Sequence, residues 1–373
     1  MEPWGLMEAS RRRRGRGDTR ILTIADGPIE VELLPDVGAR VHRLRVFGHD
    51  LLRTPEDPSA HQRDPFRWGA YLMAPWCNRI AAAPTVVDDQ LVSLAPNFED
   101  GTAIHGQVHS ARWQLAQDGT LSVRSGDDGW PWPYLCRLRV AATDAVLTLE
   151  LSLTNLGRNP MPGGLGLHPW LRRPLEVRVN AGTVLRSNMD PNAIALPVSG
   201  SWDLREMRPM PDDLDAAWPT SGDPAVELGW PDCGVQAVMR VRSDAGVWIV
   251  AASPSSVDAV AIEPQTHAPH GLHRFLNGEQ GALHPLEPGG TLELTTELAF
   301  ERRRFRYARE QHAHTPGGSS IPRLVALREE GDELALEVRD VIDDPAPDDI
   351  SVPERGLIDK MSPSIHEVVA DPK

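Results

Sequence analysis

The chain of 373 residues is long enough for one large domain or two ordinary ones, and its 40% hydrophobic content is typical of a globular protein. A net charge of −15 argues against a nucleic-acid partner, because phosphate contacts need a surplus of Lys and Arg. No apolar run approaches the roughly 18 residues that a membrane helix requires, so we expect no membrane partner either.

The first 19 residues carry a basic tract. Five arginines lie between positions 11 and 16, in the stretch RRRRGR. Twin arginines can open an export signal, but such a signal continues into an apolar segment, and here Gly17 and Asp18 follow. We therefore expect residues 1–19 to be a disordered basic tail.

Hydrophobic and polar residues alternate through much of the chain that follows. In residues 146–155, VLTLELSLTN, every second residue is a leucine from Leu147 to Leu153, which is the pattern of a strand with one buried face. Similar runs bounded by turn residues predict further strands, at residues 29–34, 40–46, 235–243, 246–253 and 291–300.

The 34 prolines and 31 glycines leave few stretches uninterrupted, and we expect no helix longer than three turns. Many strands and turns without an alternating strand–helix rhythm predict an all-β protein. At this length the fold should be a large antiparallel β-sandwich, because two stacked sheets bury more surface than one sheet can. Residues 20–306 are expected to form this one domain.

The composition changes after residue 306. Residues 317–320, GGSS, are typical of a linker, and the last 64 residues hold 15 acidic and 6 basic side chains. A hairpin is predicted within residues 323–338, whereas the acidic, proline-rich sequence after it should not pack. We expect residues 307–373 to be a linker and an acidic C-terminal extension.

The three cysteines, Cys77, Cys136 and Cys233, are few, odd in number and widely spaced. They predict free thiols and no disulfide framework. Free thiols are typical of a reducing compartment, so the expected location is the cytoplasm.

Four short segments place polar residues where a sandwich would prefer apolar ones. Each joins a strand-like run to a glycine or proline, so each can end a strand at the mouth of a cleft. They are APWCNRI (74–80), AIHGQVH (103–109), GLGLHPWL (164–171) and VAIEPQTHAP (260–269).

Glu263 and His168 are the candidates for acid–base chemistry in these segments. Glu263 follows the apolar run VDAVAI and is expected to be buried, which disfavours a carboxylate unless hydrogen bonds or cations compensate it. Taken alone, each residue favours a structural role: a stabilising pair with an arginine for Glu263, and a structural histidine for His168.

Together with LDAAW at 214–218, the four segments form an ordered set: PWCNRI, IHG, GLHPW, LDAAW and EPQT. In this order they resemble the aldose 1-epimerase (galactose mutarotase) family. The resemblance covers about residues 20–300 and implies the galactose mutarotase-like supersandwich, in agreement with the all-β prediction.

The resemblance also implies roles for individual residues. Glu263 would be the general base and His168 the general acid. Five further residues would bind sugar hydroxyls: Asn78, Arg79, His105, Asp215 and Gln265.

The implied reaction fits these side chains. Mutarotation removes the proton of the anomeric hydroxyl and protonates the ring oxygen, so that the ring opens to the aldehyde; rotation about C1–C2 and closure give the other anomer. One base and one acid on opposite sides of C1 suffice, and no metal or redox cofactor is needed. A carboxylate and a histidine with ordinary pKa values near 4.3 and 6.5 can supply opposite protonation states at neutral pH.

The chain departs from the family pattern at three points. Cys77 stands where alanine is frequent, and Trp170 where an aromatic such as tyrosine is usual. LDAAW lacks a second polar residue, so Asp223 and Asp232 stay open as alternatives to Asp215.

Two sets of histidines have spacings that can occur in metal sites. His267, His270 and His273 are spaced by three, which on a helix would bring them toward one face. Pro269 interrupts this stretch and no helix is indicated, so we expect no zinc site. The i, i+4 pair His105 and His109 lies in a strand context and is not expected to chelate.

The sequence thus predicts a cytoplasmic enzyme that interconverts the anomers of a neutral aldohexose, as a monomer or homodimer. A hexose-6-phosphate mutarotase is one alternative, with Arg172 and Arg173 as the cations that could reach a phosphate. A non-catalytic carbohydrate-binding protein of the same fold is the other.

Overall fold

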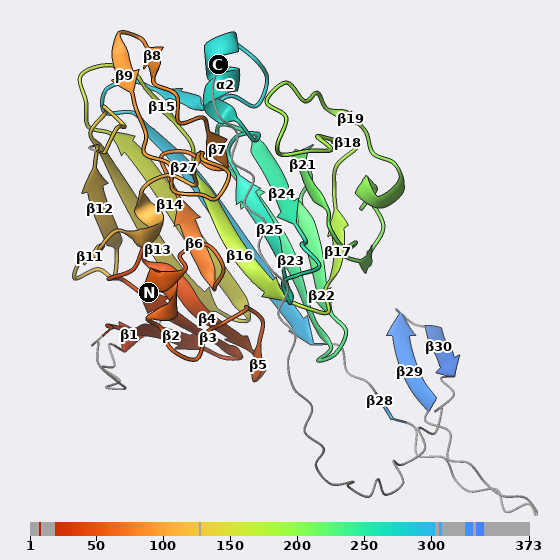
Figure 1. The fold of residues 1–373 in the computed structure, drawn as a ribbon. Helices are drawn as coiled ribbons and strands as arrows, with labels where there is room; N and C mark the ends of the chain where they lie inside the picture. Colours follow the sequence, from red (N-terminus) through yellow and green to blue (C-terminus); the bar gives the residue numbers. More distant parts are fainter. Residues whose placement is uncertain are drawn as a thin grey trace, which may run out of the picture. The chain divides into compact units, whose positions relative to one another are not determined.

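The computed structural model describes residues 7–8, 19–126, 128–302, 306–307, 325–330 and 333–338, and the chain divides into two compact units, Met1–Arg304 and Phe305–Lys373. In the first unit two large sheets lie face to face (Figure 1). Every pair of named strands that the structure describes is antiparallel. The predicted all-β sandwich is confirmed.

The first sheet has ten strands and carries the polar segments singled out above. Its order is β1-β2-β3-β4-β6-β16-β25-β24-β21, with β5 paired to β4. The strands are β1 (Met7–Glu8), β2 (Leu22–Asp26), β3 (Ile29–Leu34), β4 (Arg40–Val46), β5 (His49–Asp50), β6 (Ala70–Met73), β16 (Gly166–Arg172), β21 (Asp215–Thr220), β24 (Val247–Ala252) and β25 (Ala259–Gln265).

The second sheet has nine strands in the order β11-β12-β13-β14-β27-β23-β22-β17-β20. They are β11 (Gln114–Leu115), β12 (Leu121–Ser125), β13 (Tyr134–Thr143), β14 (Val146–Asn155), β17 (Glu176–Val179), β20 (Arg208–Pro209), β22 (Val226–Trp230), β23 (Val235–Arg242) and β27 (Thr291–Arg302).

Four two-stranded sheets and short helices complete the first unit. The strand pairs are β7 (Arg79–Ile80) with β10 (Ala103–Ile104), β8 (Thr85–Val87) with β9 (Gln90–Val92), β15 (Met161–Gly163) with β26 (His284–Leu286), and β18 (Thr183–Val184) with β19 (Leu196–Pro197). The helices are α1 (Ala60–Arg63), α2 (Gly271–Asn277) and two 3₁₀ turns (Val108–Ser110, Gly200–Trp202).

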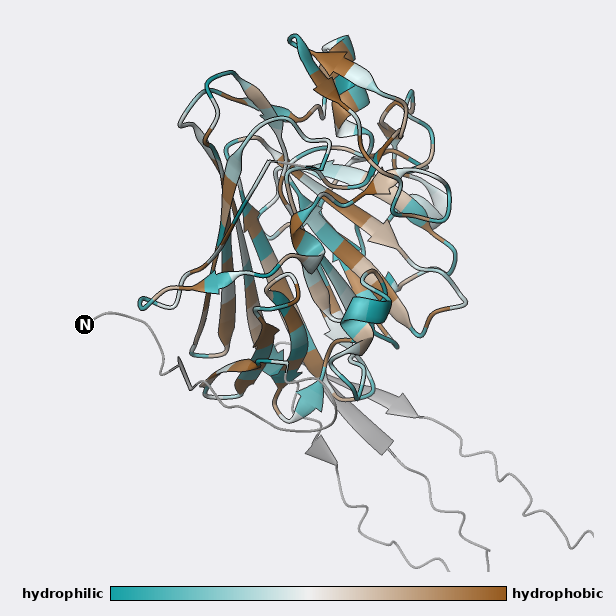
Figure 2. Cartoon of the chain, turned by 60° about the vertical axis from the view of Figure 1, so that its left-hand side comes forward, coloured by the Kyte–Doolittle hydropathy of each residue, from teal (hydrophilic) through white to brown (hydrophobic). Residues whose placement is uncertain are grey.

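The core lies between the two large sheets. Strand β14 buries Leu147, Leu149, Leu151 and Leu153 and leaves the residues between them half-buried or exposed, as the period of two predicts. Figure 2 shows this alternation of hydrophobic and hydrophilic residues along the strands. In β16 and β25 both faces are buried, because one face packs in the core and segments outside the sheet cover the other.

The terminal segments are described only in part. Met7–Glu8, inside the segment expected to be a disordered tail, pair with β2, and the rest of residues 1–18 lies outside the described residues. The second unit contains a three-stranded sheet of β28 (Arg306–Tyr307), β29 (Val325–Glu330) and β30 (Glu333–Val338). The hairpin predicted within 323–338 is therefore present, whereas the expected linker and the acidic sequence after it lie outside the described residues.

All three cysteines are free thiols, as expected. Neither of the α-helices that the structure describes has the length or the apolar character to cross a bilayer.

Candidate active site

The registers of β6, β16 and β25 place three functional side chains in one row across the first sheet. His168 pairs directly with Tyr71 of β6. On its other side, the pairs Gly166–Gln265 and Trp170–Ala261 bracket His168 and put it opposite Glu263. Cross-strand neighbours on one face of a sheet lie within contact distance, so the row Tyr71–His168–Glu263 follows from strand pairing alone.

His168 and Glu263 are in direct contact. The imidazole Nε2 lies 3.2 Å from the carboxyl Oε1, and the two residues are 4% and 3% exposed. Gln265, two residues along β25 and therefore on the same face, donates a hydrogen bond from Nε2 to the other carboxyl oxygen at 2.7 Å. Both oxygens of Glu263 thus have a fixed partner. Among the described residues no arginine pairs with Glu263, in contrast to the structural alternative raised from the sequence.

Tyr71 covers the other side of His168. The two rings stack, with centroids 4.4 Å apart and an interplanar angle of 20°. The indole of Trp170 lies 5.1 Å from the His168 ring and is held by a hydrogen bond to the carbonyl of Phe66. The imidazole is therefore fixed by aromatic neighbours from its own strand and from the adjacent one.

His105 and Asn78 are brought to this row by the small sheet of β7 and β10. Their backbones lock together, since the His105 amide donates to the Asn78 carbonyl at 3.1 Å and the Asn78 amide donates to His105 Nδ1 at 3.2 Å. Nδ1 accepts this bond, so the ring proton of neutral His105 is on Nε2. The His105 ring lies edge-on to His168, with centroids 5.1 Å apart. Gly106 has φ +72° and fits against the Ala74 carbonyl, where a Cβ would come within 2.0 Å.

Arg79, on β7, is largely buried and already has an anionic partner. Its Nε donates to Asp100 Oδ2 at 2.6 Å, and its guanidinium lies over the ring of Phe98 at 5.4 Å. Burial raises the pKa values of Glu263 and Asp215, and the charge of Arg79 partly offsets both increases, which places it within electrostatic reach of both.

Asp215, the first residue of β21, joins the site from two strands away. Its charge raises the pKa of Glu263, and its own pKa is raised by burial. The two alternatives to Asp215 are engaged elsewhere, Asp223 with Arg240 and Asp232 with Arg172. Of the three aspartates, Asp215 is the one that the fold brings to Glu263.

Burial controls the electrostatics of the His168–Glu263 pair. It lowers the pKa of His168 to about 3, and it raises the pKa of Glu263 well above the ordinary value, with a further increase from the charge of Asp215. These shifts reverse the order that the two groups have in water. The pair is therefore favoured in its neutral form, with one proton in the contact between Oε1 and Nε2.

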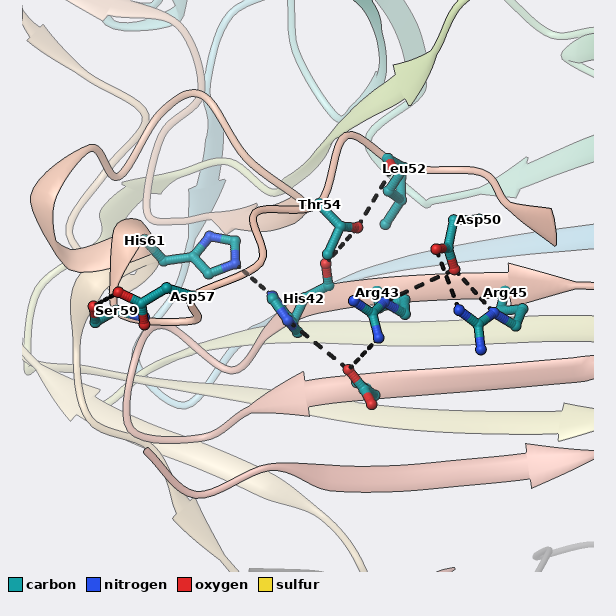
Figure 3. A network of polar contacts seen from close by, with 10 residues as sticks. His42, Arg43, Arg45, Asp50, Leu52, Thr54, Asp57, Ser59 and His61 are labelled. Carbon is teal, nitrogen blue, oxygen red and sulfur yellow. Dashed lines mark hydrogen bonds and ion pairs between the residues drawn. The ribbon is translucent and has the colours of Figure 1, made fainter. Parts of the chain in front are cut away.

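Tyr71 contacts a buried arginine, Arg40. The guanidinium carbon of Arg40 lies 5.5 Å from the Tyr71 ring, and its Nη1 donates to His61 Nδ1 at 3.1 Å. His61 Nε2 then contacts His42 Nδ1 at 2.9 Å, and His42 Nε2 lies 3.9 Å from Glu32, as Figure 3 shows for the outer part of this chain of contacts. The remaining donors of Arg40 go to three backbone carbonyl oxygens, those of Val37, Pro65 and His109.

The histidine set 267–273 differs from the expectation in one respect. A helix does form there, since α2 begins at Gly271 with His270 as its N-cap in the left-handed conformation. His267 is a structural residue, because Nε2 accepts the Cys77 amide at 2.9 Å and Nδ1 donates to the Ala268 carbonyl at 2.7 Å. Within the described residues no three His, Cys, Asp or Glu side chains are grouped to hold a metal ion.

Three residues of the site were not identified from the sequence. Tyr71 lies in the apolar run AYLM, Asp100 in an exposed turn, and Asn188, which donates from Nδ2 to Asp215 Oδ1 at 2.5 Å, in the stretch RSNMDPN. All three have the local pattern of ordinary core or turn residues. Only strand register and loop conformation bring them to the site.

The comparisons with known proteins show the family and the fold. The family model described as aldose 1-epimerase matches residues 20–298. The chain belongs to the aldose 1-epimerase family. A curated relative, the uncharacterized protein YphB of Escherichia coli K12, is 24% identical over 243 residues, which are 58% of this chain and 79% of that protein.

Solved structures of mutarotase-like proteins share the fold. A galactose mutarotase-like protein from Clostridium acetobutylicum superposes with a TM-score of 0.66 at 16% identity, over 76% of this chain and 96% of that one. Galactose 1-epimerase from Lactobacillus acidophilus superposes with a TM-score of 0.64 at 15% identity, over 80% of this chain and 99% of that one. At these identities the likeness concerns the sandwich alone.

Proposed function

We propose that this member of the aldose 1-epimerase family is an active mutarotase that interconverts the α and β anomers of a neutral aldohexose. The observation that carries the proposal is the contact of 3.2 Å between His168 Nε2 and Glu263 Oε1, two buried side chains in one row of the first sheet. A site for binding alone has no need of a buried acid–base pair, whose burial costs free energy.

In the reaction, Glu263 takes the proton of the anomeric hydroxyl while His168 gives a proton to the ring oxygen. The C1–O5 bond breaks and C1 becomes an aldehyde. After rotation about C1–C2, both transfers run backwards on the other face. Both reacting oxygens are bonded to C1, so an acid and a base in mutual contact can serve both oxygens at the same time. This differs from the expectation that the acid and the base lie on opposite sides of C1.

The shared proton sets the starting state. Its transfer from Glu263 Oε1 to His168 Nε2 converts the neutral pair into carboxylate and imidazolium, the forms in which the two groups act as base and acid. Because burial has reversed the ordinary preference of the proton for histidine, this transfer runs against the resting preference of the proton for Glu263. Each catalytic cycle returns the proton to the pair.

The binding residues supply both donors and acceptors for sugar hydroxyls. Arg79 and His105 Nε2 offer N–H donors, Asp215 offers carboxylate oxygens, and Asn78 and Gln265 have amide groups that can do either. The side-chain Oε1 of Gln265 is buried and has no partner among the described residues, so it is available to a hydroxyl.

The charges around the pair favour a neutral sugar over a sugar phosphate. Arg172 is paired with Asp232, and Arg173 contacts Asp212 at 3.0 Å, so the two cations considered for a phosphate are both neutralised. Arg79 is paired with Asp100. A dianionic phosphate would find no unpaired cation among these three arginines, and the carboxylate of Asp215 would repel it.

Polarimetry tests the proposal. Freshly dissolved α-D-glucose and α-D-galactose should reach anomeric equilibrium faster with the protein than without it, and glucose 6-phosphate should be at least about tenfold poorer in kcat/KM, because no dedicated cation awaits it. Binding of these sugars without acceleration would favour the non-catalytic alternative. A preference for the phosphate would favour the hexose-6-phosphate alternative.

A further inference from the structure

The segment between β18 and β19 runs beside the strand that carries Asp215. Leu185 exchanges two backbone hydrogen bonds with Ala217, at 2.7 and 2.9 Å, and thereby extends the first sheet by one residue. Three residues later the chain reaches Asn188, next to Asp215. The pairing of Leu185 with β21 thus determines where the Asn188 side chain lies.

The loop is held in this position from helix α2. His270 Nε2 donates to the carbonyl of Asn188 at 2.9 Å, and Arg274 Nη2 donates to the carbonyl of Ala193 at 2.8 Å. Neither donor is freely exposed, since Arg274 is buried and His270 is partly buried. Asn188 therefore occupies a fixed place and is not part of a freely moving turn.

The amide of Asn188 is only half satisfied. The residue is 1% exposed, and its Nδ2 donates to Asp215 Oδ1 at 2.5 Å. Its Oδ1 is buried and finds no donor among the described residues. The opposite orientation of the amide would set Oδ1 against the carboxylate oxygen of Asp215, and two acceptors repel. The free acceptor is therefore a consequence of the bond to Asp215.

We propose that Asn188 determines sugar specificity: its Oδ1 accepts a hydrogen bond from one hydroxyl of the bound aldose, while its Nδ2 holds Asp215 in place. The inference rests on the proposed function, because it takes Asp215 to face the sugar. A buried acceptor without a donor is costly, and a sugar hydroxyl is the kind of donor that the site would receive.

A purely structural role for Asn188 makes a different prediction. If the amide only orders the loop and Asp215, its removal should lower the affinity and kcat/KM for all sugars by the same factor. If Oδ1 accepts from one hydroxyl, its removal should abolish the discrimination against the one deoxy-sugar that lacks that hydroxyl, and leave discrimination at the other positions unchanged.

The experiment compares wild-type protein with Asn188→Ala on D-glucose and on its 2-, 3-, 4- and 6-deoxy analogues. Polarimetry gives kcat/KM, and calorimetric titration gives Kd. For wild type, we expect one deoxy-sugar to be poorer than glucose by about tenfold or more. In Asn188→Ala that penalty should vanish at this one position. Asn192→Ala, at an exposed site in the same loop, is the matched control and should keep the wild-type pattern.

Equal losses on all five sugars, or no loss, would overturn the inference. If Asn188→Ala does not fold, as judged by circular dichroism, the same series is measured with Asn188→Ser. Failure of the proposed function can be told apart from failure of this inference. If wild-type protein binds sugars without turnover, the pattern of Kd values still decides the role of Asn188. Wild-type protein that neither binds nor turns over these sugars would refute both.

Discussion

The buried histidines behind the site make the stability of the fold depend on pH. Arginine can only donate, so the bond from Arg40 requires that His61 Nδ1 accepts and that the ring proton of His61 is on Nε2, where it is donated to His42. Protonation of His61 would break its bond to Arg40. Burial and the Arg40 charge lower the pKa of His61 to about 2, and burial, as the main cause, lowers those of His42 and His109 to about 4 and about 3.

The sign of the effect follows from proton uptake. In the unfolded chain these histidines have pKa values near 6.5, whereas in the folded protein they stay neutral until about pH 4 or below. Between these limits the unfolded state binds more protons, so the free energy of unfolding falls as the pH falls. From pH 7.5 to pH 5.5 each such histidine costs about 1.4 kcal/mol, and the three together about 4 kcal/mol. That is a large part of the 5–15 kcal/mol typical of a domain.

Urea unfolding, followed by tryptophan fluorescence at several pH values, measures this dependence. Other groups titrate as well, so the decisive quantity is the difference between wild-type protein and His61→Gln, whose amide can still accept from Arg40. This difference should shrink by about 1.4 kcal/mol between pH 7.5 and pH 5.5, because the variant no longer has that proton to gain in the unfolded state. A difference that is independent of pH would show that His61 is not held neutral, and would refute the reasoning.

The remaining predictions concern catalysis. Glu263→Gln and His168→Asn should each lower kcat by ~10²-fold or more in a folded protein, the scale of a lost general acid or base; polarimetry that finds near wild-type turnover would remove that residue from the mechanism. Arg79→Ala should raise KM, whereas the control Arg172→Ala should not, since Arg172 is the last residue of β16 and its guanidinium pairs with Asp232, outside the candidate site; equal effects would contradict a binding role for Arg79. The pH profile of kcat/KM should show no acid limb centred near pH 6.5, because burial lowers the pKa of His168 to about 3. An acid limb centred near 6.5 would contradict the shared-proton pair.

The sequence predicts the long strands well because their signal is local. Strands β3, β4 and β14 have the bounds that alternation or apolar composition predicts, since each residue reports its own face of the sheet. The short strands of the small sheets, such as β7 and β10, have no such signal, because two residues cannot show a period. Helix α2 was missed because its first turn follows Pro269 and an N-cap in the left-handed conformation.

The site is predictable only as far as its motifs extend. That Glu263 and Gln265 share a face follows from their spacing of two along a strand. The contact of Glu263 with His168 does not follow from spacing, because it depends on the pairing of β25 with β16. His168 lies 95 positions before Glu263 in the chain. The position of Asn188 is harder still to predict from the sequence. It depends on the two backbone hydrogen bonds between Leu185 and Ala217 and on the hydrogen bonds that His270 and Arg274 donate to the loop.

The candidate site is divided between the middle of the first sheet and segments at its periphery, and this division determines which substitutions can alter sugar preference. His168 and Glu263 are fixed by ladder hydrogen bonds in the middle of a large sheet, where a shift of either would break the register of several strands. Apart from Gln265 on β25, the proposed hydroxyl-binding groups come from β7 and the residue before it, from the residue after β10, and from the edge strand β21 and its neighbouring loop, each held by a few side-chain contacts. Substitutions in these peripheral segments can alter which hydroxyls are accepted and leave the proton-transfer pair in place. Sugar preference should therefore vary among proteins with this sandwich more readily than the reaction itself.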